Sequence, residues 1–188
     1  MSLTYLYNKL ENMSSREQYT YIVNIFKNFE ITPKFPIDEI FKDSAGKQSK
    51  GKNPLGYLVM HLNETELDEL VPKYLRDLCN YDTFSDLVDA TILDVICRTT
   101  LFIETKDTDY LEELDYNVSD MLSVFEFGVG KYSPWSFIKL NPYTLVPALF
   151  RHLYKHHYIS KIDKESGLPH IAHAACNLRM IQLILEKN

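Results

Sequence analysis

The sequence lacks the features that define several large classes of protein. It has no run of about 18 apolar residues, so a membrane-spanning helix is not expected. Its first residues lack the basic segment followed by an apolar stretch that marks a secretory signal. An excess of basic side chains is also missing, since 20 Lys and Arg stand against 26 Asp and Glu. Binding to duplex nucleic acid, which needs a basic surface, is therefore not expected either.

Cysteine is scarce and scattered along the chain. Cys79, Cys97 and Cys176 are its three cysteines, and no two of them have the C-x-x-C spacing of a structural zinc site or a redox motif. Each lies among apolar residues, which predicts a small buried side chain. Isolated thiols are typical of a reducing compartment, so we expect a cytoplasmic protein.

Three common catalytic motifs are absent. Neither Gly-Lys pair within residues 43–53 is followed by Ser or Thr, so the phosphate-binding frame G-x-x-x-x-G-K-[ST] is missing, and this polar stretch predicts a flexible surface loop. No His-Asp doublet occurs, which disfavours metal phosphohydrolases of the HD type. Cys176 follows His173 by three residues on one predicted helix, and this spacing favours packing over a Cys-His hydrolase.

Apolar residues recur at helical spacing through most of the chain, and the alternation typical of strands is nearly missing. We predict helices that start near residues 15, 63 and 83, followed by helices over 109–127, 142–157 and 168–186. Ser15-Arg16-Glu17-Gln18 resembles a capping box at the start of the first helix. The length of 188 residues fits one domain, or one domain with a helical extension. The predicted fold class is mostly α, a helical bundle.

The run from Asp163 to Asn177 is the densest group of polar residues in the chain. On a helix, His170, His173 and Asn177 fall at i, i+3 and i+7, so they project from one face. Asp163 and Glu165 come just before this helix. Such a stripe either faces a metal-bound phosphate or forms a hydrogen-bond network in the core, and the spacing alone leaves both alternatives open.

Residues 120–182 resemble a known family. The motifs are Phe127-Gly128-x-x-Lys131-Tyr132-x-x-Trp135, then Leu149-x-Arg151-His152-Leu153, then Asp163-x-Glu165-Ser166-Gly167-Leu168-x-His170-x-x-His173-Ala174-x-x-Asn177. In this order they resemble the phage dATP/dGTP diphosphohydrolase family, which belongs to the MazG-like all-α nucleoside triphosphate pyrophosphohydrolases. The resemblance divides the chain into a region with these motifs, 116–188, and a helical N-terminal region of unknown role, 1–115.

The resemblance implies a phage-encoded hydrolase that acts in the host cytoplasm. It would convert a (deoxy)nucleoside triphosphate to the monophosphate and pyrophosphate with Mg²⁺ or Mn²⁺ as cofactor. The alternative is a protein on the same scaffold that binds and sequesters a nucleotide without cleaving it. The expected partner is a nucleotide or a related small molecule, and the resemblance also suggests a homo-oligomer.

The resemblance implies roles for individual residues. Asp163 and Glu165 match acidic positions of the family, so we expect them to hold metal and to take part in catalysis. His170 and His173 would orient the attacking water or contact phosphate, or would fasten the helices together. Direct binding of Mg²⁺ by imidazole is less favourable, since hard cations prefer oxygen ligands. A charge pair at a helix N-terminus is the structural alternative for the two carboxylates.

Substrate-binding roles are implied for a second set of residues: Lys131, Tyr132, Trp135, Arg151, His152 and Asn177. Lys131 and Arg151 would contact phosphate, and Tyr132 and Trp135 would stack on the base, although aromatic packing in the core is the commoner role. Enzymes of this type generally carry a carboxylate pair three residues apart on an earlier helix. Here that helix offers Asp120 and Glu126, six residues apart, as further metal ligands. Asp120 is predicted to lie opposite the apolar stripe, which would make the metal site incomplete.

Overall fold

A computed structural model describes residues 84–111 and 114–187, together with isolated positions between residues 8 and 30. Within these ranges the chain is mostly helical, which confirms the predicted fold class. The predicted helix near residue 63, the loop at 43–53 and Cys79 lie outside the described residues. Near the N-terminus, the backbone N–H of Ser14 donates to Glu17 Oε2 at 2.8 Å, and the N–H of Glu17 donates to Ser14 Oγ at 3.4 Å. The capping box therefore begins one residue earlier than predicted.

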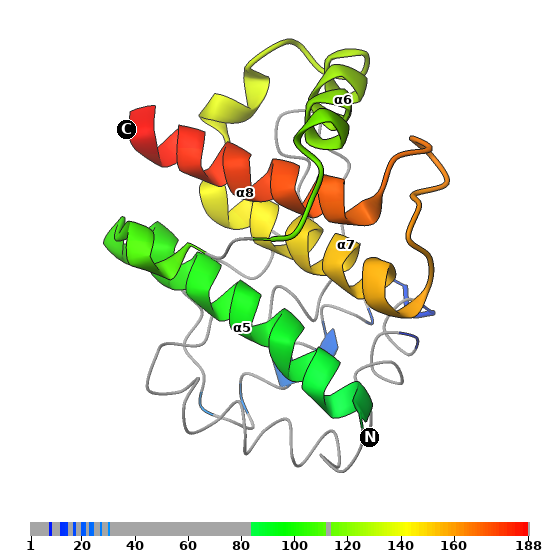
Figure 1. Cartoon of the computed structure of the whole chain (residues 1–188). Coiled ribbons are helices and arrows are strands. Elements are labelled where there is room, and N and C mark those ends of the chain that lie inside the picture. The colour runs from blue at the N-terminus through cyan, green and yellow to red at the C-terminus, as the bar shows by residue number, and fades with distance from the viewer. Residues whose placement is uncertain are drawn as a thin grey trace.

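Helix α7 (Val146–Tyr158) is the centre of the described bundle. Helix α8 (His170–Lys187) packs against it on one side, and α5 (Phe84–Thr105) packs on the other. Helix α6 (Val118–Val129) lies on α8 (Figure 1). Helices α7 and α8 run antiparallel because the short segment 159–169 reverses the chain between them (Figure 1).

Two apolar clusters hold these helices together. The larger one joins α5, α7 and α8 through fully buried side chains such as Ile96, Leu149 and Ile181. The smaller one joins α6 and α8, and consists of Met121, Val124, Ala172, Ala175 and Cys176. Small alanine side chains on α8 allow α6 to approach closely. Cys176 is buried as predicted, while Cys97 is half-buried.

The predicted helix over 109–127 is wrong in its first half. Thr108–Tyr110 form a short 3-10 helix, and Leu111 is already extended, with φ −71° and ψ 123°. The α-helix begins at Val118 because the side chain of Asn117 accepts a hydrogen bond from the N–H of Ser119 at 2.8 Å. An asparagine is far more favourable at this capping position than inside a helix. The apolar periodicity across residues 109–127 therefore extends past the true N-terminus of α6.

The helices predicted over 142–157 and 168–186 are present with altered starts. Pro142–Leu145 form a 3-10 turn that Asn141 caps, and the α-helix follows from Val146. Helix α8 begins at His170. The loop before it is closed by an antiparallel bridge between Ile162 and Pro169. Among the described residues, no helix combines the length and the apolar character needed to cross a membrane.

Candidate functional site

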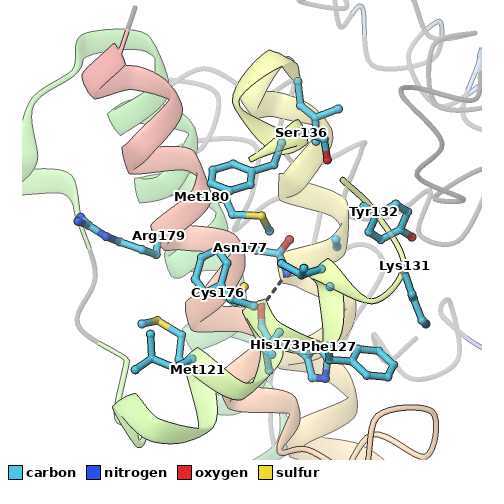
Figure 2. Close-up of a pocket in the computed structure, with 18 of the residues that line it drawn as sticks. Met121, Phe127, Lys131, Tyr132, Ser136, His173, Cys176, Asn177, Arg179 and Met180 are labelled. Carbon is cyan, nitrogen blue, oxygen red and sulfur yellow. Dashed lines mark hydrogen bonds between the residues drawn. The ribbon is translucent and has the colours of Figure 1, made fainter. Parts of the chain in front are cut away.

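A pocket of about 630 Å³ lies where the C-terminal end of α6 and the following turn meet α7 and α8 (Figure 2). Its wall on α8 is formed by His173, Cys176, Asn177, Arg179, Met180 and Leu183. A volume of this order suits a ligand of several hundred daltons. The pocket is large enough for a nucleotide.

The pocket has a charged end and an apolar end. Near the start of α8 its lining includes Lys131, Arg151, Asp163, Glu165 and His173. Further along, the lining is mostly apolar or aromatic and includes Met121, Phe125, Phe137, Leu140, Met180 and Leu183, with Asn177 and Arg179 as polar exceptions on α8. A ligand that is anionic at one end and flat or apolar at the other matches this division.

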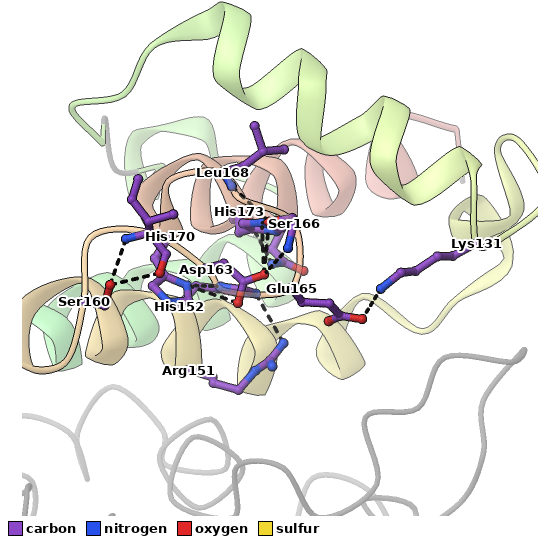
Figure 3. Close-up of polar contacts among 12 residues, drawn as sticks. Lys131, Arg151, His152, Ser160, Asp163, Glu165, Ser166, Leu168, His170 and His173 are labelled. Carbon is purple, nitrogen blue, oxygen red and sulfur yellow. Dashed lines mark hydrogen bonds and ion pairs between the residues drawn. The ribbon is translucent and has the colours of Figure 1, made fainter.

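Asp163 is the centre of the loop that leads into α8. Its Oδ2 accepts hydrogen bonds from the backbone N–H of Ser166 at 3.2 Å and from Ser166 Oγ at 3.0 Å (Figure 3). The carbonyl of Asp163 accepts from the N–H of Gly167 at 2.8 Å, where the chain adopts φ 72°. Glycine adopts this left-handed conformation at little cost. The Asp-x-x-Ser-Gly sequence thus fixes the carboxylate through its own loop.

Ser166 links this carboxylate to His173. The Ser166 hydroxyl donates its one proton to Asp163, so His173 Nε2, 2.8 Å from the same oxygen, is the donor to it. Ser166 Oγ also accepts from the N–H of Leu168 at 3.2 Å. Both Ser166 and Asp163 thus face the same nitrogen of His173, with Asp163 Oδ2 at 3.8 Å. This arrangement is not a nucleophilic triad, in which serine and aspartate bind opposite ring nitrogens.

A second chain of hydrogen bonds links Arg151, His152 and His170. Arg151 Nη2 lies 3.2 Å from His152 Nε2, and because arginine can only donate, this nitrogen carries no proton. Neutral His152 then holds its proton on Nδ1 and donates to His170 Nδ1 at 2.9 Å. The partners, rather than an observed hydrogen, assign these tautomers. His170 is only 3% exposed and does not line the pocket.

The imidazoles of His152 and His173 stack face to face, with ring centres 4.5 Å apart and planes 5° from parallel. Two charged rings would repel at this distance. Burial, followed by the charge of Arg151, lowers the pKa of His152 far below its ordinary value. Burial likewise lowers the pKa of His173 to about 4, against the opposing effect of Asp163. We conclude that the stacked pair is neutral at pH 7.

The pKa of Asp163 is lowered from its ordinary value, although burial acts in the opposite direction. Hydrogen bonds from Ser166 and the nearby His173 and His170 outweigh the burial. Asp163 Oδ1 lies 4.0 Å from His170 Nδ1, and no described residue donates a hydrogen bond to Oδ1. Asp163 is therefore a carboxylate at pH 7, and one of its oxygens remains available to a ligand.

Lys131 and Glu165 form an ion pair at the mouth of the pocket (Figure 3). Their side chains are 36% and 69% exposed, so the pair contributes little to stability. The Lys131 ammonium also lies over the ring of Phe127, 4.3 Å from its centre. An anionic ligand could take this lysine from Glu165 at small cost.

Most of the predicted site residues line this one pocket: Lys131, Tyr132, Trp135, Arg151, His152, Asp163, Glu165, His173 and Asn177. The pocket lining does not include Asp120, Glu126 or His170. Asp120 is half-buried in the first turn of α6, where its charge complements the helix N-terminus, and Glu126 is exposed. Trp135 is 66% exposed, and its ring lies 5.8 Å from that of Phe137.

Sequence reasoning missed Ser166 and the apolar wall. Ser166 joins Asp163 to His173, and the Asp-x-x-Ser spacing was a usable signal for it. Met180 continues the stripe of His173 and Asn177 at i+7 and i+3, which could have placed it in the same wall. Phe137 and Leu140 come from the irregular segment after α6, and no periodicity indicates their direction.

Within the residues that the structure describes, no group of three or more His, Cys, Asp or Glu side chains is arranged to hold a metal ion. Asp163 and Glu165 supply two carboxylates to the pocket. Carboxylate oxygens suit Mg²⁺, which commonly takes one or two carboxylates from the protein and its other ligands from water and substrate phosphate. The donor chemistry therefore fits an ion that is shared with a phosphate ligand.

The fold and the site together define a mostly α protein with a nucleotide-sized pocket. Residues 117–188 match the family of dATP/dGTP diphosphohydrolase, N-terminal. This match confirms the resemblance predicted for residues 120–182, and it contains every residue that lines the pocket. Comparison with curated proteins and with solved structures gave no match.

Proposed function

We propose that this protein hydrolyses a deoxynucleoside triphosphate to the monophosphate and pyrophosphate, with Mg²⁺ or Mn²⁺ bound alongside the substrate. The observation that carries the proposal is the pocket itself, which has Lys131, Arg151 and two carboxylates at one end and mostly apolar side chains at the other. The name of the matching family, dATP/dGTP diphosphohydrolase, supports a purine deoxynucleotide as substrate.

The triphosphate occupies the charged end. Arg151 uses one of its five N–H donors on His152, which fixes the guanidinium beside the pocket and leaves other donors for phosphate oxygens. Lys131 supplies a second positive charge when it leaves Glu165. Two cations on different elements clamp the phosphate chain from two sides, and such positioning is the main requirement of phosphoryl transfer.

Asp163 and Glu165 would hold the divalent ion, which neutralises charge on the phosphate oxygens. Asp163 offers Oδ1, since Ser166 occupies Oδ2. Glu165 is the more exposed of the two carboxylates, with 69% of its side chain accessible against 17% for Asp163. It is therefore the better placed to take the proton of the attacking water. The water oxygen forms a bond to the α-phosphorus while the bond from that phosphorus to the α–β bridging oxygen breaks, which yields the monophosphate and pyrophosphate.

The role of the histidines is to hold these groups in position. His173 donates to Ser166, and Ser166 donates to Asp163, so the imidazole holds the carboxylate in place through the hydroxyl. His152 stacks on His173 and donates a hydrogen bond to His170, so its ring helps to hold His173 in place. Neutral imidazoles also avoid adding positive charge beside the ion, which is consistent with their lowered pKa values.

The test is a product assay on the purified full-length chain. The four dNTPs are incubated with Mg²⁺, with Mn²⁺ or with a chelator, and monophosphate and pyrophosphate are separated by anion exchange. We expect both products in equal amounts, and their loss with the chelator. Asp163→Asn and Glu165→Gln should lower kcat by at least about a hundredfold, since each removes a charge next to the reacting phosphate.

Asp115→Asn is the matched control, because Asp115 is an exposed carboxylate outside the pocket. Its activity should equal that of the wild type. If no nucleotide is cleaved under any condition, yet dNTPs raise the melting temperature, the protein sequesters nucleotides and the hydrolase proposal is wrong. Full activity of Asp163→Asn would contradict the roles assigned to the carboxylates.

A further inference from the structure

Asn177 is a buried polar side chain in the middle of the α8 wall of the pocket. It is 6% exposed and lies between Cys176 and Met180, with the charged end one turn away at His173. Its Nδ2 donates to the backbone carbonyl of His173 at 2.8 Å (Figure 2). A carbonyl can only accept, so this contact assigns the nitrogen of the amide to the helix and its oxygen to the other side.

The remaining oxygen, Oδ1, accepts no hydrogen bond from any described residue. An amide oxygen in an apolar wall is costly unless a donor reaches it. Asn177 therefore presents an acceptor to whatever fills the pocket. The tether to its own helix uses one of the two N–H groups of Nδ2 and holds the amide so that Oδ1 points away from the His173 carbonyl.

The level of Asn177 along the α8 axis determines which part of the ligand it contacts. Asn177 follows His173 by four residues, which is about 6 Å along the helix axis. On the antiparallel α7, Ala148 comes one turn before His152, whose ring stacks on His173, and the small side chain of Ala148 also lines the pocket. A ligand whose phosphates lie at His173 and Arg151 brings its sugar to this level.

We propose that Asn177 is a specificity-determining residue that accepts a hydrogen bond from the 3′-hydroxyl of the substrate sugar. The proposal rests on the proposed function, because that function orients the nucleotide with its phosphates at the charged end. The 3′-hydroxyl is a donor on the sugar face next to the α-phosphate. The protein therefore discriminates against nucleotides that lack this donor, since they leave Oδ1 buried and unpaired.

The first test needs no mutation. A dNTP is compared with the 2′,3′-dideoxy nucleotide of the same base, and with the 3′-amino-2′,3′-dideoxy nucleotide, which restores a donor at this position. We expect the dideoxy compound to lose about 10- to 100-fold in kcat/KM. The 3′-amino compound should recover most of the loss. Equal use of the dNTP and the dideoxy nucleotide would overturn the proposal.

The second test uses Asn177→Leu, which keeps the approximate size of the side chain and removes the acceptor. This variant should use the dNTP and the dideoxy nucleotide about equally, because kcat/KM falls for the dNTP and stays unchanged for the dideoxy nucleotide. Asn177→Asp retains an acceptor and should still prefer the dNTP. If Asn177→Leu discriminates as strongly as the wild type, Asn177 supports only the helix and the proposal is wrong.

Binding distinguishes this proposal from the proposed function. If no nucleotide is cleaved, the same comparison is made as a ratio of Kd values by calorimetry with Mg²⁺ present. A preference for the 3′-hydroxyl without turnover would support the role of Asn177 and contradict hydrolysis. Binding of neither nucleotide would overturn both proposals.

Discussion

The ammonium group of Lys131 makes two interactions at the edge of the pocket. It pairs with Glu165, lies 4.3 Å from the centre of the Phe127 ring, and lines the pocket. Lys131→Ala should raise KM for a dNTP roughly tenfold with a smaller effect on kcat, because a partly exposed lysine contributes mainly to ground-state binding of the triphosphate. Steady-state kinetics at fixed ionic strength measures both constants.

Lys164→Ala is the control for this change. Lys164 is exposed on the same loop as Glu165 but does not line the pocket. Both lysines carry one positive charge, so the Lys164 variant measures the rise of KM that comes from the loss of charge alone. An equal rise of KM in both variants would show that Lys131 has no specific contact with the triphosphate.

Partly or fully buried histidines make stability depend on pH. The pKa of His173 is lowered to about 4 and that of His156 to about 4, in both cases mainly by burial, while unfolded histidine titrates near 6.5. Between these values the unfolded chain binds protons that the folded chain excludes. The free energy of unfolding should therefore be flat above about pH 7 and fall as the pH drops from 6.5 toward 4.

Each fully neutral histidine contributes up to about 1.4 kcal/mol per pH unit within that window. Urea denaturation at pH 7.5, 6.5, 5.5 and 4.5 measures the slope. His152→Phe keeps an aromatic ring against His173 but cannot be protonated, so its slope should be smaller than that of the wild type. A wild-type stability that is constant down to pH 4.5 would show that the imidazoles are charged in the folded protein.

At the scale of the elements, the start of α6 depends on one amide. Asn117 caps the helix through Ser119, and α6 supplies Met121 and Val124 to its contact with α8. Asn117→Ala should lower the free energy of unfolding by about 1 kcal/mol, since alanine leaves an N–H of the first turn without its acceptor. Asn117→Asp, which retains the acceptor, should stay within about 0.5 kcal/mol of the wild type. Chemical denaturation compares the three chains, and equal loss in both variants would assign the effect to some other contact of Asn117.

The same element shows why sequence prediction succeeded for helices and failed for one of their starts. Leu111, Leu114 and Val118 have helical spacing, so periodicity joined them into one helix. In the structure Leu111 and Leu114 instead pack on the larger core from irregular chain. Burial requires only that an apolar side chain reaches the core, and an extended segment can satisfy the same spacing. The competing signal was the capping preference of Asn117, which is local and weaker than a long apolar stripe.

At the scale of the whole molecule, the sequence motifs predicted residues that lie far apart in the chain and line one pocket. Lys131, Arg151, Asp163 and Asn177 are spread over 47 positions of the chain, and the structure brings them into one lining. The motifs could predict these residues because each motif supplies a different wall of the pocket. Asp120 and Glu126 were predicted from the usual composition of such sites, and the direction of α6 keeps them out of the lining. That direction depends on contacts with α8 that no local pattern encodes.

The arrangement of the carboxylates predicts how metal and nucleotide bind together. No group of three or more metal-binding side chains exists within residues 84–111 and 114–187 or at the isolated positions that are described. Asp163 and Glu165 should therefore hold Mg²⁺ weakly unless a ligand supplies further oxygens. A dNTP provides these oxygens. Mg²⁺ alone should therefore raise the melting temperature by no more than about 1 °C, whereas Mg²⁺ with a non-hydrolysable dNTP should raise it by several degrees. The nucleotide with a chelator should fall between the two.

The joint stabilisation by Mg²⁺ and nucleotide depends on the whole site, because one ligand would contact a loop, a turn and two helices. Asp163→Asn should abolish the added effect of Mg²⁺ and retain the effect of the nucleotide alone, because Lys131 and Arg151 remain. Asp115→Asn should behave as the wild type, since Asp115 lies outside the pocket. If Mg²⁺ alone stabilises the protein as strongly as Mg²⁺ with nucleotide, the ion has a complete protein site of its own, and the carboxylates of the pocket do not share it with the phosphates.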